Sequence, residues 1–154
     1  MEPTDIAWAA GIVDGEGCIR TTRHRHRALS VELTVTNTDP RMLFKLRELF
    51  GGNICQQRKA SEKGRATWCW RVHCENAICI LETLLPFLIV KRDQASLAIS
   101  FRQLRRQRGG RIGDKDVRIA NEALYEKQCW LDRQLRQMKR EVFSVSGAST
   151  TGGV

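Results

Sequence analysis

The sequence predicts an α+β fold with the element order α-β-β-α-β-β-α, completed by C-terminal helices. Three observations carry this prediction: a short apolar helix near the N-terminus, two pairs of segments typical of strands, and a helix-forming segment after each pair. The chain has 154 residues, 42% of them hydrophobic, which suits one domain with one core. We expect a single domain over residues 1–143 and a disordered tail over 144–154, where Ser, Thr and Gly dominate.

The chain is strongly basic, with 26 Lys and Arg against 17 Asp and Glu and a net charge of +9. This charge predicts a polyanionic partner, nucleic acid first, although a basic scaffold or protein-interaction domain has the same balance. No apolar run reaches the roughly 18 residues of a membrane span, and no basic region precedes an apolar stretch at the N-terminus. We expect an intracellular, non-secreted protein without membrane or small-molecule partners. A bacterial or phage cytoplasm and an organelle both stay open.

The first helix should begin at Thr4, a good N-cap residue, and end at Gly15. One of its faces consists of small residues and an acid at positions i, i+3, i+4 and i+7. These four are Ala7, Ala10, Gly11 and Asp14. Because three of them are nearly free of side chain, the face predicts close contact with a second copy of the same helix.

Two acids stand at the end of this helix. Asp14 lies where the helix dipole disfavours negative charge, and Glu16 projects beyond Gly15. If two copies of the helix pair, their acidic ends approach and repel unless cations lie between them. The pattern indicates a metal site assembled by dimerisation. A buried helix followed by a solvated acidic turn explains the same residues.

Residues 18–36 predict a β-hairpin that turns near His26. Apolar and polar residues alternate strictly over 28–36, with Leu33 and Val35 among those expected to face the core. The opposite face of the hairpin carries Arg, Thr, His, Ser and Glu. A two-stranded ribbon with such hydrogen-bonding groups fits the DNA major groove, whereas a solvated sheet face is the alternative.

The next three elements are a helix over 41–50, which the pair Gly51-Gly52 ends, and strands over 53–58 and 67–73. On the last strand, Trp68, Trp70 and Val72 are assigned to the core face, since these large apolar groups would otherwise be exposed. A tryptophan pressed against DNA is the alternative.

Helices are then expected over 75–85, over 91–107, and from Asp114 to about residue 140. The six cysteines include no Cys-x-x-Cys pair, and Cys69, Cys74 and Cys79 are spaced five apart, which does not fit zinc. We expect reduced cysteines that serve as packing residues.

The stretch AAGIVDGEG resembles the LAGLIDADG motif of homing endonucleases. Ala9 replaces the leading Leu, Ile12 and Val13 stand at the Leu-Ile positions, Gly15 takes an alanine position, and Glu16 replaces the penultimate Asp. Glu16 is one methylene longer than that Asp. Because the chain carries the motif once, the resemblance implies a homodimer. It also implies a saddle-shaped antiparallel sheet that binds DNA, and a role in intron homing.

The resemblance extends to three further residues. Asn37, at the end of LTVTN, lies where the family often has Gln or Asn near the water network. Arg41 matches a basic residue near the scissile phosphate. Lys91, in PFLIVKRDQA, matches a lysine in a similar PFLxxKxxQA stretch of the family, which would stabilise phosphate charge or perturb the network of the attacking water. In isolation these residues also fit a turn, a surface charge and a helix-terminal cation.

The predicted catalytic residues are therefore Glu16, Asn37, Arg41 and Lys91. Glu16 and the Gly15 carbonyl are the expected metal ligands, and Mg²⁺ is the expected ion, since hard cations prefer oxygen ligands. Mn²⁺ or Ca²⁺ can occupy the same site.

DNA contacts are expected from polar residues of the strands and from basic residues in loops and helix ends. The candidate base readers are Arg20, Thr22, His24, His26, Ser30, Glu32, Thr34, Gln56, Arg58 and Arg71. The candidate phosphate contacts are Arg108, Arg111 and Lys115.

The function predicted from the sequence is that of a homodimeric endonuclease. It would cut both strands of a long, near-palindromic double-stranded DNA site by metal-dependent hydrolysis. A non-cleaving protein of the same fold, such as an RNA maturase that assists intron splicing, is the alternative.

Overall fold

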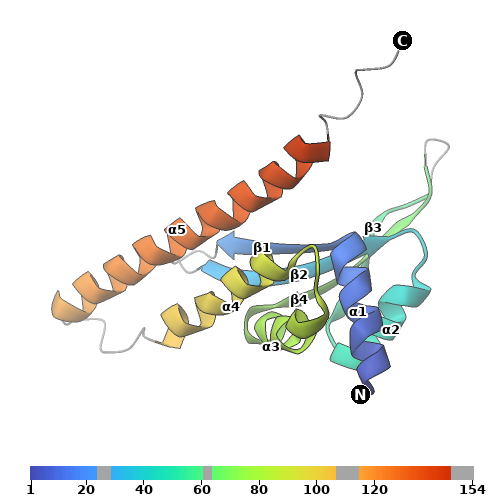
Figure 1. The fold of residues 1–154 in the computed structure, drawn as a ribbon, viewed down its shortest axis with the longest axis horizontal. Helices are drawn as coiled ribbons and strands as arrows, with labels where there is room; N and C mark the ends of the chain where they lie inside the picture. Colours follow the sequence, from blue (N-terminus) through green and yellow to red (C-terminus); the bar gives the residue numbers. More distant parts are fainter. Residues whose placement is uncertain (24–28, 61–63, 107–114, 147–154) are drawn as a thin grey trace, which may run out of the picture.

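The computed structural model describes residues 1–23, 29–60, 64–106 and 115–146. In this part of the chain, one antiparallel sheet has the strand order β1-β2-β4-β3, and helices pack against it (Figure 1). The strands are β1 (Gly17–Arg23), β2 (Leu29–Asn37), β3 (Asn53–Arg58) and β4 (Thr67–His73). The helices are α1 (Pro3–Glu16), α2 (Arg41–Phe50), α3 (Cys74–Leu84), the short 3-10 helix η1 (Leu85–Phe87), α4 (Arg92–Arg106) and α5 (Lys115–Ser146). The predicted α+β order is confirmed.

The core lies between the sheet and the helices. Leu33 and Val35 of β2 are fully buried, as the alternation predicted, and they belong to one cluster with residues of α1, α3 and α4. Trp70 of β4 is also fully buried, and its indole Nε1 donates a hydrogen bond to the Gly51 carbonyl at 2.8 Å. Trp68 is half-buried against the same cluster, so the parity predicted for β4 is confirmed.

The turn between α2 and β3 depends on its two glycines. Gly51 and Gly52 have φ angles of +71° and +90°, which side-chain-bearing residues rarely adopt. A Cβ on Gly52 would also lie 2.5 Å from a methyl carbon of Val72. The predicted end of α2 is thus confirmed, and the close approach explains why a second glycine follows the first.

Both ends of α1 differ from the prediction. The helix begins at Pro3 with Glu2 as its N-cap, because proline at the first helical position is preorganised for the turn. It also runs through Gly15 and ends at Glu16. The backbone N–H of Gly17 then bonds to the Val13 carbonyl, whose oxygen would lie only 2.5 Å from a Cβ on Gly17. The glycine required by the fold is therefore Gly17, whereas a Cβ on Gly15 would meet nothing within 4 Å.

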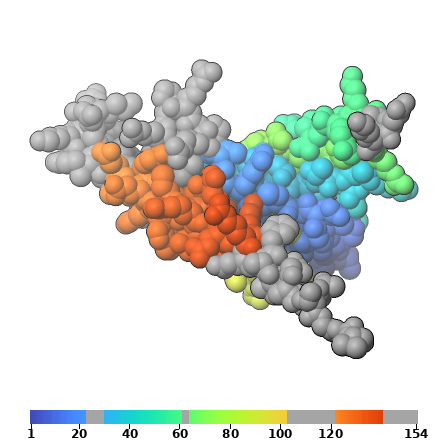
Figure 2. Space-filling model, turned by 90° about the horizontal axis from the view of Figure 1, so that it is seen from above, coloured from blue at the N-terminus to red at the C-terminus, as the bar shows by residue number. Residues whose placement is uncertain are grey.

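Helix α5 packs against α4 and β1 (Figure 1). In the space-filling view, its orange surface lies beside the blue N-terminal part of the chain (Figure 2). Leu131 and Leu135 are buried there, and the Thr21 hydroxyl on β1 donates a hydrogen bond to the Asp132 carboxylate. The helix continues to Ser146, so residues 143–146, which the sequence placed in or beside a tail, are helical. No helix in the described part of the chain is long and apolar enough to cross a membrane.

Candidate functional site

The end of α1 is fastened to the segment before α4 by one carboxylate. Oδ2 of Asp14 accepts hydrogen bonds from the backbone N–H groups of Ile89 and Val90, at 2.7 and 3.3 Å. Oδ1 accepts the N–H of Lys91 at 2.9 Å. These groups precede the first turn of α4, where donors lack helical partners. Asp14 was predicted to lie at a dimer interface, but its carboxylate bonds to main-chain groups of the same chain.

This arrangement brings Lys91 to the end of the predicted motif. Its Nζ donates a hydrogen bond to the main-chain carbonyl of Asp14, although the two residues are 77 positions apart. Burial lowers the pKa of Lys91, and the nearby charge of Lys139 lowers it further; the attraction of Asp14 and Glu16 offsets only part of this shift. The half-buried ammonium group therefore lies beside Gly15 and Glu16, both of which are exposed.

A cleft of about 280 Å³ opens at this corner, and we call it the α1–α4 cleft. It is lined by Gly15, Gly17, Cys18, Val90, Lys91, Gln94 and Lys139. Gln94 is 6% exposed, and its Oε1 has no hydrogen-bond partner among the described residues. Lys139 of α5 reaches the same place, with Nζ 3.2 Å from the sulfur of Cys18.

The sequence did not identify Gln94 or Lys139 as site residues. Gln94 belongs to the same PFLIVKRDQA stretch as Lys91, so the match at Lys91 also indicated that Gln94 lies near the site. No sequence signal points to Lys139, because it depends on how α5 docks.

Asn37 and Arg41 form a separate local network. Oδ1 of Asn37 accepts the N–H of Asp39 at 2.9 Å, and Oδ1 of Asp39 accepts the N–H of Arg41 at 3.0 Å. Hydrogen bonds from the side chain and backbone of Arg41 lower the pKa of Asp39 to about 2. Since Val35 pairs with Gly17, this turn lies at the same end of the sheet as the α1–β1 junction.

The structure therefore brings two of the four predicted catalytic residues, Glu16 and Lys91, to one corner. Among the described contacts, Asn37 and Arg41 are not bonded to either of them. The Arg41 side chain is 87% exposed, although its Nε and Nη2 are paired with the carboxylate of Asp39.

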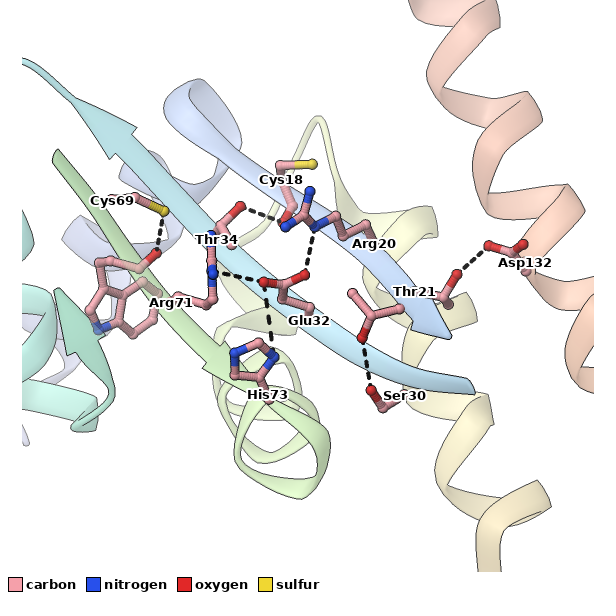
Figure 3. Close-up of polar contacts among 12 residues, drawn as sticks. Cys18, Arg20, Thr21, Ser30, Glu32, Thr34, Cys69, Arg71, His73 and Asp132 are labelled. Carbon is pink, nitrogen blue, oxygen red and sulfur yellow. Dashed lines mark hydrogen bonds and ion pairs between the residues drawn. The ribbon is translucent and has the colours of Figure 1, made fainter. Parts of the chain in front are cut away.

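The sheet face opposite the helices carries a charged group centred on Glu32 (Figure 3). Oε2 of Glu32 lies 2.6 Å from Nε of Arg20, and Oε1 lies 2.9 Å from Nε of Arg71. Nδ1 of His73 is 3.9 Å from Oε1. Burial raises the pKa of Glu32, but the hydrogen bond from Arg20 and the charges of Arg20 and Arg71 outweigh it and hold that pKa below its usual range.

Other predicted base readers on this face are bonded to one another or to the backbone. The hydroxyls of Thr22 and Ser30 lie 2.9 Å apart, and the Thr34 hydroxyl is 3.5 Å from the Cys18 carbonyl (Figure 3). Both Ser30 and Thr34 are buried.

The two candidate base readers on β3 lie on opposite sides of the sheet. Gln56 pairs with Trp68, so it shares the helix-covered side of the sheet and is not on the face with Arg71. A register shift between Gln56 and Arg58 then places Arg58 opposite Thr67, on the side of Arg71. Gln56, predicted as a base reader, therefore does not share the open face with Arg71.

Several candidates cannot be placed. His24, His26, Arg108 and Arg111 lie outside the described residues, as does the side chain of Lys115.

The predicted dimer face of α1 is only partly available. Ala7 and Gly11 are exposed, and a Cβ on Gly11 would meet nothing within 4 Å. Ala10, in contrast, is fully buried in the core of its own subunit and offers no surface to a partner. Its assignment to the dimer face is corrected, because the helix buries that side against its own sheet and α3.

Apolar side chains are exposed beside this face. Phe87, Ile89 and Val90 are 43%, 85% and 59% exposed, in and after η1, which contacts α1.

The described residues do not by themselves supply a complete set of metal ligands. Among the described residues, no group of three or more His, Cys, Asp or Glu side chains could hold a metal ion. The carboxylate of Glu16 and the Gly15 carbonyl are oxygen ligands of the kind that hard cations accept, with water and phosphate oxygens completing the shell. The donor set thus fits a divalent cation only if a substrate or a second subunit supplies further oxygens.

No protein-family model and no curated protein matches the chain. Solved structures do resemble it. The homing endonuclease I-CvuI, in complex with its target in the presence of Ca, is 24% identical over 90% of this chain and 94% of that one, with a TM-score of 0.58. The archaeal intron-encoded homing endonuclease I-Vdi141I, complexed with DNA, is 17% identical over 90% and 86%, with a TM-score of 0.65.

A third structure, the I-SmaMI LAGLIDADG homing endonuclease bound to cleaved DNA, is 19% identical over 80% of this chain and 49% of that one, with a TM-score of 0.52. At such identities the likeness establishes the fold. The resemblance stated from the sequence is confirmed at that level: the chain has the fold of LAGLIDADG homing endonucleases.

Proposed function

We propose that this chain, on the premise of its LAGLIDADG fold, is a homodimeric endonuclease. It cleaves both strands of a long, near-palindromic DNA site by divalent-metal-dependent hydrolysis. One observation carries the proposal: Asp14 fastens the segment before α4 to the end of α1, which brings the ammonium group of Lys91 beside the exposed Glu16. A carboxylate and a partly desolvated cation thus converge at an open corner.

A second copy of the chain would complete the site. The exposed Ala7 and Gly11 allow two α1 helices to approach closely, and the exposed Ile89 and Val90 would be covered by the same contact. Two such helices would place two Glu16 carboxylates near each other, one for each DNA strand.

The residues of the corner have distinct tasks. Glu16 and the Gly15 carbonyl would hold Mg²⁺, for which Mn²⁺ or Ca²⁺ can substitute. When bound, the cation supplies Lewis-acid stabilisation of the charge that develops on the phosphate. Lys91 adds a second positive charge, which is effective because its surroundings are partly desolvated.

Asn37 and Arg41 would act from the neighbouring turn. Arg41 has an exposed guanidinium group that can contact a phosphate near the cleavage site. The amide of Asn37, whose Oδ1 is used by the turn, retains its NH₂ donors for water or phosphate oxygen.

DNA would lie on the open face of the sheet. Strand β2 has nine residues and spans about 30 Å, which corresponds to roughly nine base pairs. The net charge of +9 supports binding to a polyanion. Two subunits would together contact a site too long to occur often by chance.

The test is cleavage of a plasmid library by the purified chain, with Mg²⁺ and with a chelator. We expect linear products with Mg²⁺ only, and loss of cleavage by about 100-fold or more in Glu16→Gln, which should still bind the selected DNA in Ca²⁺. The matched control is Glu48→Gln, which removes an exposed carboxylate of α2 and should cut normally. Cutting by Glu16→Gln at the wild-type rate, or without a divalent cation, would refute the proposal.

A further inference from the structure

Glu32 has a buried carboxylate on the face proposed to contact DNA. Its side chain is 1% exposed, although the residue lies on the side of β2 that points away from the helices. The sequence suggested that this carboxylate reads cytosine directly. Its burial removes it from the reach of a base, so that assignment is corrected.

The side chains that cover Glu32 come from the two neighbouring strands. Arg20 is its cross-strand partner on β1, and His73 is its partner on β4. Arg71 lies one step along β4, opposite Thr34. A carboxylate in this position is costly to bury unless charged donors surround it, and two guanidinium groups do so here.

Both ion pairs use the same atom of the arginine. Nε of Arg20 donates a hydrogen bond to Oε2 of Glu32, whereas Nε of Arg71 lies 2.9 Å from Oε1 as an ion pair without hydrogen-bond geometry. Each guanidinium group therefore keeps its outer edge, with the two Nη nitrogens, available for a ligand. The side chains of Arg20 and Arg71 are 48% and 34% exposed, so these edges are accessible.

An arginine edge with two parallel N–H donors matches guanine, whose O6 and N7 accept two hydrogen bonds in the major groove. The backbones of Arg20 and Arg71 lie on opposite sides of β2, about two strand spacings or 10 Å apart. Their Nε atoms converge on the two oxygens of one carboxylate, so the two guanidinium groups are closer together than the backbones. Because they approach that carboxylate from opposite sides, their outer edges would reach different base pairs, which are spaced about 3.4 Å apart.

We propose that Glu32 is a positioning residue for sequence recognition, which holds Arg20 and Arg71 as a fixed pair of guanine-reading forks. The specificity at two base pairs of each half-site then depends on a carboxylate that does not touch DNA. The inference rests on the proposed DNA binding, but not on cleavage.

Selection of bound sequences from a randomised duplex library tests this inference, with Ca²⁺ present so that binding is read without cleavage. The wild-type chain should select guanine at two separate positions of each half-site. Glu32→Gln keeps the shape of the side chain but removes its charge. It should still bind DNA and lose the preference for guanine at both positions by about tenfold or more.

The matched control is Asp5→Asn, which removes the carboxylate of an ion pair with Lys45 on the helical side, where Asp5 Oδ1 lies 3.1 Å from Lys45 Nζ. It should leave every base preference unchanged. A purely structural role of Glu32 would lower the melting temperature of Glu32→Gln without changing the selected bases.

Should Glu32→Gln fail to fold, Glu32→Asp decides the question, because it keeps the buried charge and draws it back by one methylene. A folded Glu32 variant with wild-type base preferences overturns the inference. So does a wild-type chain that selects sites without guanine. If the wild-type chain selects no DNA at all, the proposed function fails first, and that result is distinguishable from the others.

Discussion

The α1–α4 corner and the open sheet face each depend on one carboxylate, but the two carboxylates have different partners. Asp14 accepts three backbone N–H groups, so it fixes the path of the main chain around Lys91. Glu32 pairs with two guanidinium groups, whose backbones are already fixed by the strand ladder. Loss of Asp14 should displace a loop, whereas loss of Glu32 should release only side chains.

The difference teaches how one small fold can keep its chemistry constant while its recognition changes. At the corner, Asp14 binds main-chain N–H groups, so the acid has to stay even where the neighbouring side chains change. On the sheet face, a carboxylate and its partner arginine can be replaced together without moving a strand. We expect cleavage and sequence preference to be separable by mutation.

The largest effect should come from the corner. Lys91→Met removes the ammonium group beside Glu16 and should reduce the cleavage rate by about 100-fold, since a cation in a partly desolvated site stabilises developing phosphate charge strongly. Binding of the selected duplex in Ca²⁺ should change little. The rate is measured on a labelled duplex at saturating protein. A matched change on the exposed start of α4, Arg92→Met, should cut at nearly the wild-type rate, and equal losses in both variants would contradict the assignment.

A smaller loss of activity should follow from Asp14→Asn. The amide keeps one acceptor oxygen but loses the charge and the second acceptor, so the segment at Ile89 is held less firmly. We expect a roughly tenfold slower reaction and a loss of stability of about 1–3 kcal/mol, measured by urea denaturation. Base preferences in the library selection should stay as in the wild type. A change in those preferences would break the separation between the two regions.

These two acids also show what the sequence could and could not predict. The bounds of α2, β3 and β4 agreed with the prediction, because alternation and the Gly51-Gly52 stop are local signals. Asp14 was expected to be a structural residue of the paired helices, but its actual partners, and those of Glu32, were not predicted. The first depends on a segment 77 positions away, and the second on two neighbouring strands that meet only in the folded sheet.

The same reason explains why Lys139 was missed. It approaches Cys18 across 121 positions of the chain, through the docking of α5 on β1. The local sequence pattern predicted the helix of the motif and the projecting Glu16, and the family resemblance pointed to Lys91. The surroundings that lower the pKa of Lys91 arise only from tertiary packing.

The contribution of the Glu32 ion pairs to stability should decrease as the pH falls. The pKa of Glu32 is lower in the folded chain than in the unfolded one, so its pairs stabilise the fold above the unfolded pKa and lose this contribution as pH falls through the folded pKa. The free-energy difference between wild type and Glu32→Gln should be constant near neutral pH and shrink in the acidic range. Urea denaturation of both proteins at several pH values measures it. A difference that grows on acidification would contradict the pairing.

The two glycines of the motif should differ in their effect on stability. Gly17→Ala places a Cβ 2.5 Å from the Val13 carbonyl oxygen and should destabilise the chain by about 1–3 kcal/mol. Gly15→Ala meets open space and should change the free energy of unfolding by less than about 0.5 kcal/mol. Thermal denaturation of the two variants measures both. If both substitutions lower the free energy of unfolding equally, the close approach at the α1–β1 junction is not as described.

The most direct measurement is a crystal structure of the chain with its selected duplex and Ca²⁺. We predict two copies on one duplex, with their α1 helices in contact at Ala7 and Gly11 and each Glu16 beside a cation. A single copy on the duplex, or Glu16 remote from both the cations and the other copy, would contradict the account.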